Sequence, residues 1–501
     1  MGRFIKKELL ILYLIIFVGL FLRVQGIFTN SFAFTYDVGR DMLAVSDIVH
    51  LGKILLIGQT TGLPGLFYGP WWYYILIPPF VLASGDPAGV ALFIALSGAV
   101  TVLLGFKLGK GIGGTVLGLV FASFLSFSPV MVGLTSQIWN PNLIPLFIII
   151  FMYCLHRIFV FLEKKKGIGV AYLLFLGLLL GLILDLEVVF GLLFLVGAII
   201  SIILFLGKRI KLKDYLFIIL GFFIIMFPRI VFELRHNFLM TNALMSFVGN
   251  TLSSSNGSQS SFAPVNSFIR LYGLWTDTIS MGNVFWGFVL LFLLAFGLIS
   301  LHKKMEKEKK FFLLINLIIL TTFLIGLSFF PGAIWSHYIV GIPVLYIFIL
   351  SIAVSKLLHL KKTRFIIVLA FVILLASYVN PIRIISEYQK PLWEGDASVY
   401  RNQLVIVDYI YKEAQGKEFK YVVYTPPVHD YTYKYLFKWY GLNKYNYLPS
   451  SNSRLAYFIL EPDLQYPSRL TDWLRLREKD GRIIKAEKFK SGIIVETRIN
   501  Q

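Results

Sequence analysis

Residues 168–206 read IGVAYLLFLGLLLGLILDLEVVFGLLFLVGAIISIILFL, and much of the fold follows from this stretch. Its two apolar runs, 168–186 and 188–206, are each long enough to cross the roughly 30 Å hydrocarbon layer of a bilayer as a helix. Asp185 and Glu187 lie at the turn between them. A charge at the rim of a span is unfavourable unless it faces protein or water, so these two side chains are expected to face one or the other. These two carboxylates are either supporting groups of a site, a cation site, or a plain polar helix end.

The rest of the chain has the same composition. Of its 501 residues, 57% are hydrophobic and only 15% are charged, against about 25% charged in a soluble globular protein. This excludes a soluble enzyme, a disordered chain and a disulfide scaffold. It predicts a mainly α, polytopic helical membrane protein with about 12–13 transmembrane helices. The predicted spans are Leu9–Leu22, 67–84, 88–106, 142–161, 168–186, 188–206, 214–231, 283–301, 311–329, 335–357 and 363–381, with two short helices in 112–140, broken around Ser126–Pro129.

Basic clusters between the spans predict which ends face the cytoplasm. The amino terminus is then cytoplasmic, and residues 26–66, 232–282 and 382–501 lie outside the plasma membrane. This arrangement needs two crossings within 112–140 and places Lys107 and Lys110 outside, against the usual bias. The polar stretch Ser253–Ser261 is expected to be flexible. The clusters are Arg3 with Lys6 and Lys7, His156–Lys166, Lys208–Lys213, His302–Lys310 and Lys356–Arg364.

We expect two domains, a transmembrane domain at 1–381 and an extracytoplasmic α/β domain at 382–501. The second contains helix patterns and strand patterns in turn. The net charge of +20 does not indicate nucleic-acid binding, because most of the excess lies in short clusters between spans. The one cysteine, Cys154, excludes an intramolecular disulfide and a cysteine-based metal site. The expected helices are Ser398–Ala414 and Tyr431–Tyr440, and the expected strands are Tyr421–Tyr424, Ala456–Leu460 and Ile493–Thr497.

Acidic residues are scarce before residue 382, yet Asp37, Asp41 and Asp47 all lie in the first outer loop. On a helix, Asp37 and Asp41 share one face. Close like charges are unfavourable unless a cation, a metal or a substrate group compensates them. Spacing alone leaves two interpretations open, a functional site at the membrane boundary or a solvated loop helix in which Arg40 is an ion-pair partner.

Other outer turns carry further candidates, and each has a structural alternative. The aromatic run 67–74, which includes Tyr68, is either a platform for a sugar ring or lipid chain or an interfacial aromatic belt. Trp139 and Asn140 mark either a site or an ordinary break before a span. Phosphate contacts are the functional interpretation of Arg235, His236 and His337-Tyr338, although a lone histidine in such a turn is more often at a helix end.

Several familiar motifs are absent from the sequence. There is no Walker-type glycine loop, no GxSxG and no HExxH. No predicted span carries a regular ladder of arginines or acidic residues, which argues against a voltage sensor and a proton relay.

Four stretches, taken in order, resemble the GT-C superfamily of integral-membrane glycosyltransferases. Within it, the chain is most similar to the branch of protein O-mannosyltransferases and lipid A aminoarabinose transferases (ArnT-like). The layout of an acidic outer loop, a multi-span body and an outer soluble domain matches over residues 1 to about 381. The stretches are Tyr36-Asp37-Val38-Gly39-Arg40-Asp41, Phe67-Tyr68-Gly69-Pro70-Trp71-Trp72-Tyr73-Tyr74, Trp139-Asn140-Pro141-Asn142 and Phe232-Glu233-Leu234-Arg235-His236-Asn237.

The resemblance implies transfer of a sugar from a polyprenyl-phosphate donor to an extracytoplasmic protein, lipid or glycan, with inversion and with a loop carboxylate as general base. Asp37 occupies the family's catalytic-acid position. Many members have Asp-Glu there, whereas this chain has Asp37-Val38, so the second carboxylate is expected to be Asp41.

Further site residues follow from the same resemblance. Groups that offset the phosphate charge of the leaving group are expected among Arg40, Lys53, Arg235 and His337. A divalent ion, Mg or Mn, stays open as a cofactor, and no residue is assigned as a metal ligand. The full set of expected substrate contacts is Arg40, Lys53, Tyr68, Trp139, Asn140, Glu233, Arg235, His236, His337 and Tyr338.

Two other functional classes compete with this one. A secondary transporter or lipid-linked-sugar flippase predicts paired broken helices, midplane charges and an internal repeat, none of which is evident in the sequence. A non-catalytic scaffold that presents the outer domain to a partner would not require carboxylates in the first loop.

Overall fold

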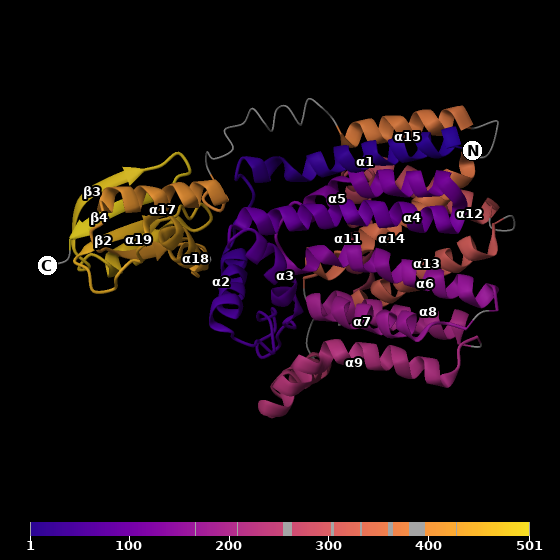
Figure 1. Cartoon of the computed structure of the whole chain (residues 1–501), viewed down its shortest axis with the longest axis horizontal. Helices are drawn as coiled ribbons and strands as arrows, with labels where there is room; N and C mark the ends of the chain where they lie inside the picture. The colour runs from indigo at the N-terminus through magenta and orange to yellow at the C-terminus, as the bar shows by residue number, and fades with distance from the viewer. Residues whose placement is uncertain are drawn as a thin grey trace.

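The computed structural model describes residues 2–165, 167–207, 209–253, 263–301, 305–330, 333–358, 364–379, 396–426 and 428–499. A bundle of long helices makes up most of it, and a smaller part with a β-sheet lies at the end of the bundle opposite the amino terminus (Figure 1). The helices of the larger part are α1 (Gly2–Phe28), α2 (Tyr36–Leu51), α3 (Trp71–Leu82), α4 (Pro87–Phe127), α5 (Pro129–Leu134), η1 (Asn140–Leu143), α6 (Ile144–Glu163), α7 (Val170–Leu186), α8 (Val188–Leu206), α9 (Leu212–Arg235), α10 (Leu239–Ser253), α11 (Pro264–Ile279), α12 (Val284–Leu301), α13 (Lys307–Ser328), η4 (Ser336–Ile339), α14 (Ile342–Leu357) and α15 (Arg364–Tyr378).

The bundle confirms the polytopic helical class. By length and composition, seven of the described helices can cross a membrane, or eight if the pair α11–α12, bent by 92°, counts as one span. Helices α3, α7 and α15 are apolar but shorter. Small residues hold the bundle together where helices meet, as expected for membrane helices. Gly177 and Gly181 on α7 lie directly against the backbone of α9.

Helix α4 is two helices rather than one. Its backbone leaves the helical conformation at Gly113 and Gly114, and Gly114 has a φ of +84°, which only glycine adopts easily. A Cβ on Gly109 would lie 2.8 Å from the Cα of Gly118, so the two halves run back along each other. The turn of this hairpin therefore lies at residues 113–114.

This hairpin corrects the prediction for residues 112–140. They make one crossing, interrupted at Ser128, and not two short helices. Lys110 forms an ion pair with Glu8 of α1, and Thr115 donates a hydrogen bond to the same carboxylate. Lys110 therefore lies on the side of the amino terminus, so its predicted position on the opposite side is wrong.

Helix α3 corrects a second predicted span, 67–84. It has 12 residues, about 18 Å of helix, which is too short to cross. Both of its ends lie on the side of the C-terminal part. The N–H of Trp71 binds Asp185 at the end of α7, and the carbonyl of Ser84 accepts a hydrogen bond from Trp439. Helix α3 is therefore an element of the first outer loop.

The expected second outer loop contains more structure than the sequence indicated. It includes α10 and α11, and Ala263 at the start of α11 binds the carbonyl of Ser328 at the end of α13. Most of the stretch expected to be flexible, Ser253–Ser261, lies outside the described residues.

The C-terminal part is a four-stranded sheet packed with helices, as predicted for the α/β segment. The sheet order is β1-β2-β4-β3, with β1 and β2 parallel and the other pairs antiparallel. The predicted helices and strands are all present, while α19 and β3 had not been expected. The elements are α17 (Tyr400–Ala414), β1 (Lys420–Tyr424), α18 (Tyr431–Tyr440), η5 (Gly441–Tyr445), β2 (Leu455–Leu460), α19 (Pro467–Leu476), β3 (Arg482–Lys488) and β4 (Ile494–Ile499).

Candidate active site

Helix α2 brings the acidic motif together on one face. It begins after Thr35, which is extended, and ends at Gly52, whose φ of +63° lets its N–H bind the carbonyl of Asp47. Within the helix, Arg40 lies between the two carboxylates. One guanidinium nitrogen is 2.6 Å from Oδ1 of Asp37 and another is 2.8 Å from Oδ1 of Asp41. The ion-pair interpretation of Arg40 is thus correct, and the pair of carboxylates it joins is part of a larger polar site.

The two carboxylates have different surroundings. Asp41 is 1% exposed and also accepts a hydrogen bond from the indole N–H of Trp72. Burial raises the pKa of Asp41 to about 6, although Arg40 and Trp72 act in the opposite direction. The Asp37 side chain keeps 27% of its surface exposed, and it contacts Arg40 at 2.6 Å and the hydroxyl of Tyr36. Asp37 is therefore the carboxylate that a substrate can reach.

Asp37 lines a cavity of about 230 Å³ together with Trp139 and Gln137. The ring of Trp139 meets the ring of His337 edge to face at 5.2 Å. His337 lies within electrostatic reach of Asp37. The structure thus joins the start of α2, the turn before α6 and the turn before α14 around one carboxylate.

A second cavity, of about 190 Å³, lies beside the first outer loop. Tyr68, Glu187, Trp335 and Tyr338 are among the residues that line it. Burial raises the pKa of Glu187 to about 8, and the hydrogen bond from Tyr68 acts in the opposite direction. Burial, the neighbouring Glu187 and, to a smaller extent, Asp37 all raise the pKa of Tyr68. Aromatic rings around a carboxyl group are well suited to a sugar ring or another polar ring.

Buried acceptors without a donor surround this region. The side-chain amide of Asn140 donates to the carbonyl of Leu186, but its oxygen has no described partner. One oxygen of Asp185 and one of Glu187 are likewise buried without a donor, while the other oxygen of Asp185 accepts from the N–H of Trp71. Unpaired buried acceptors are unfavourable, so this wall is suited to a ligand that supplies hydrogen-bond donors.

Asp185 and Glu187 are therefore candidate site residues, and they were not among the expected substrate contacts. The sequence carried one signal for them, two carboxylates at the end of an apolar run. That signal could not separate a site from a polar helix end. The contacts with Trp71 and Tyr68, more than 100 residues away, resolve it.

Of the ten expected substrate contacts, Tyr68, Trp139 and Tyr338 line one of these cavities. Arg40 and His337 line neither cavity but contact Asp37 and Trp139, which do, and Asn140 is buried against the carbonyl of Leu186.

The remaining four lie apart from both cavities. Lys53 pairs with Asp47 at 2.8 Å. Glu233 accepts hydrogen bonds from the N–H groups of Met240 and Thr241 and so caps the start of α10. His236 stacks on Phe232, with ring centroids 4.1 Å apart, and Arg235 is exposed at the end of α9.

The described residues include no group of three or more His, Cys, Asp or Glu side chains that could hold a metal ion. Both carboxylates of α2 are engaged by Arg40, and Glu187 is paired with Tyr68. The residues present therefore do not fit the Mg or Mn ion that the sequence left open as a cofactor.

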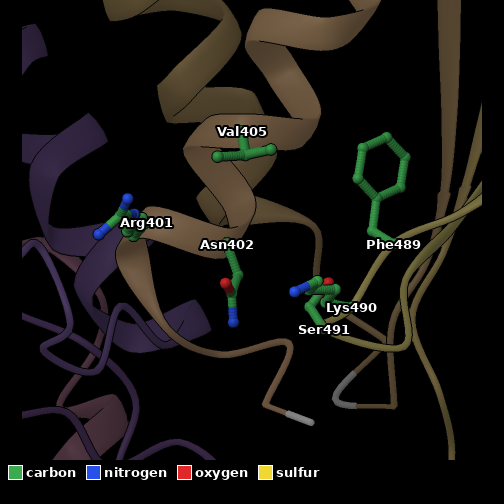
Figure 2. A pocket seen from close by; sticks show the side chains of 6 residues that line it. All are labelled: Arg401, Asn402, Val405, Phe489, Lys490 and Ser491. Atoms are coloured by element: carbon green, nitrogen blue, oxygen red, sulfur yellow. The ribbon is translucent and has the colours of Figure 1, made fainter. Parts of the chain in front are cut away.

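A third cavity, of about 350 Å³, lies in the C-terminal part between α17 and the turn that joins β3 to β4. Its polar side chains do not converge. In Figure 2, Arg401 points away from Lys490 and Ser491, and Phe489 points away from Asn402. This cavity lacks the arrangement of an active site.

No protein-family model matches the sequence, and no curated protein matches it. Solved structures of ArnT from Cupriavidus metallidurans are similar over 99% of this chain and 98% of theirs, at 11% identity. The TM-score is 0.58 for the apo form and 0.57 for the form bound to undecaprenyl phosphate. The oligosaccharyltransferase of Archaeoglobus fulgidus matches at a TM-score of 0.49 and 12% identity, over 97% of this chain and 72% of its own. The chain therefore has the GT-C fold of integral-membrane glycosyltransferases, as its resemblance to the aminoarabinose-transferase branch predicted.

Proposed function

We propose that the protein is a membrane glycosyltransferase that moves a sugar from a polyprenyl-phosphate donor to an acceptor on the outer side of the membrane. The observation that carries the proposal is the pair of unequal carboxylates on α2, of which Asp37 lines a cavity, in a GT-C fold. Undecaprenyl phosphate, which one of the similar ArnT structures binds, belongs to the proposed class of lipid carrier.

In the proposed reaction, Asp37 accepts the proton of an acceptor hydroxyl or amine. The acceptor atom then forms a bond to the anomeric carbon, and the bond from that carbon to the lipid phosphate oxygen breaks. The phosphate leaves with the bonding electrons, and the anomeric configuration is inverted. Asp41 holds Arg40 in place, and Arg40 orients Asp37.

The other residues around the cavities have binding roles in this proposal. Arg40 and His337 face the developing negative charge of the leaving phosphate. Trp139, Tyr68 and Tyr338 contact the sugar through their rings, and Asn140 accepts hydrogen bonds from its hydroxyls. With the amino terminus in the cytoplasm, as the basic clusters indicate, α2 and the C-terminal part lie outside the cell.

The test uses the purified full chain in liposomes with radiolabelled polyprenyl-phosphate sugars and a membrane extract as acceptor. We expect label to move from the lipid to the acceptor, with and without EDTA. Passage of the labelled lipid across the bilayer without transfer would contradict the proposal and favour a flippase. Loss of transfer in EDTA would contradict the metal-free assignment alone.

A further inference from the structure

The C-terminal part packs on α2 from the side opposite its carboxylates. Gly39 lies between Asp37 and Asp41 in sequence, and two residues correspond to about 200° around a helix. A Cβ at Gly39 would lie 2.5 Å from the backbone nitrogen of Thr432 and 2.6 Å from the carbonyl carbon of Tyr431. Glycine is disfavoured inside a helix, and here its lack of a side chain lets α18 approach α2 directly.

Two more contacts continue along the same face. The ring of Tyr36 lies 5.9 Å from the ring of His429, which precedes α18. Two turns beyond Gly39, Asp47 forms an ion pair with Lys438 of α18 at 3.1 Å. Helices α2 and α18 lie beside each other in Figure 1.

Helix α18 is itself anchored to the membrane part. The hydroxyl of Tyr435 donates to the carbonyl of Gly85, and the indole of Trp439 donates to the carbonyl of Ser84 at 2.8 Å. These carbonyls belong to the turn between α3 and α4. Helix α18 therefore contacts both the turn between α3 and α4 and the face of α2 opposite its carboxylates.

The segment that leads into α2 is held in the same way. The N–H of Phe34 binds the carbonyl of Ser398, and the N–H of Tyr400 binds the carbonyl of Phe32, at 2.8 and 3.0 Å. The C-terminal part thus contacts α2 along its back and also at its entry.

We propose that the C-terminal domain positions the carboxylate helix, with α18 holding α2 so that Asp37 and Arg40 face the cavity. Gly39 and the pair Asp47–Lys438 are positioning residues that do not touch the substrate. The inference rests on the proposed transferase function, because the position of α2 matters only if its carboxylates act.

The first test exchanges the charges of the ion pair in the full chain. We expect Lys438→Asp to lower kcat about tenfold, since a close pair of like charges repels, with the donor KM unchanged. The double variant Asp47→Lys with Lys438→Asp should recover kcat to within about threefold of wild type, because the attraction is restored. Lys434→Glu is the matched control on the same helix and should leave kcat unchanged, because the described side-chain contacts of Lys434 are with Asp430 and the ring of Tyr431 and not with α2.

The second test inserts a methyl group at the contact. Gly39→Ala should lower kcat about 100-fold, because a displacement of about 1 Å in a catalytic group has effects of this size. Gly273→Ala, at a helical glycine with open space around it, is the control. Hydrogen exchange of α2 should speed up in Gly39→Ala and Lys438→Asp and return to the wild-type rate in the exchanged pair.

The outcomes separate the two proposals. If the wild type transfers sugar and both single variants do so at the wild-type kcat, the positioning role is overturned and the transferase function stands. Faster exchange of α2 without any loss of kcat overturns the positioning role in the same way. A wild type that transfers no sugar overturns the proposed function, and the positioning role with it.

Discussion

Trp72 donates its indole N–H to Oδ2 of Asp41 at 2.7 Å, while Arg40 binds only the other oxygen, Oδ1. Both oxygens of Asp41 are therefore occupied, and the side chain is buried. Asp37, four residues earlier, contacts Arg40 and Tyr36 and remains partly exposed. The sequence left open which carboxylate is the base, and this contact assigns Asp41 to holding Arg40 and leaves Asp37 for the substrate.

Asp41 should give the protein a pH-dependent stability. Its pKa is about 6 in the folded chain and 3.8 without perturbation. A group whose pKa is raised by folding stabilises the fold below its unfolded pKa, and this contribution is lost as the pH rises through the folded pKa. The free energy of unfolding of the wild type relative to Asp41→Asn should thus fall by about 2 kcal/mol between pH 4 and pH 7.

Thermal unfolding in detergent at several pH values measures this difference. The exposed Asp277 supplies the control, and Asp277→Asn should show no such trend. A relative stability that rises with pH would mean that the attraction of Arg40 outweighs burial at Asp41.

Glu187 should behave as a neutral acid at pH 7, because burial raises its pKa to about 8. Glu187→Gln keeps both shape and charge at that pH, so transfer should remain within about twofold of wild type. Glu187→Ala leaves Tyr68 without its partner and should lower transfer about tenfold. The pH–rate profiles of the wild type and Glu187→Gln should separate only above about pH 8. A glutamine variant as inactive as the alanine variant at pH 7 would show that Glu187 acts as an anion.

Two arginines from the set of expected substrate contacts, Arg40 and Arg235, should differ sharply in their importance for sugar transfer. Arg40→Ala removes the guanidinium that joins Asp37 to Asp41, so the two carboxylates repel each other and Asp37 loses its orientation. We expect transfer to fall about 100-fold. Arg235→Ala should change transfer by less than about twofold, because Arg235 is exposed and lines neither cavity. Kinetics of the two variants side by side provide the measurement, and equal losses would place Arg235 at the site.

Lys110 tests the corrected topology. The only cysteine, Cys154, is 3% exposed, so labelling by a membrane-impermeant maleimide should have a low background. Lys110→Cys and Lys213→Cys should react from one side of the membrane and Lys479→Cys from the other. Labelling of Lys110→Cys together with Lys479→Cys would restore the two crossings first expected in 112–140.

Much of the fold could be predicted because local sequence dictates it. Apolar runs of membrane length such as 188–206 became helices, and alternating strands such as β2 appeared where expected. Helix α3 is an element whose role local sequence does not determine. Its apolar residues are those of a membrane span, but the contact of Trp71 with Asp185 holds its first end. Contacts of Ser84 and Gly85 with residues about 350 positions later hold its second end on the same side.

The site could likewise be predicted only where local sequence determines it. The spacing of Asp37, Arg40 and Asp41 predicted that they share one face of a helix, because about one helical turn separates them. The role of Glu233 was hidden, because a carboxylate that caps a helix and one that binds a substrate look alike in sequence. Three-dimensional contacts with Met240 and Thr241 decide between them.

The proposed reaction depends most directly on Asp37 as the base. Transfer from a polyprenyl-phosphate sugar should fall by at least about 100-fold in Asp37→Asn, while binding of polyprenyl phosphate and the melting temperature stay near those of wild type. Asp277→Asn, the matched change at an exposed carboxylate, should retain full transfer. An Asp37→Asn protein that still transfers sugar at the wild-type rate would contradict the account.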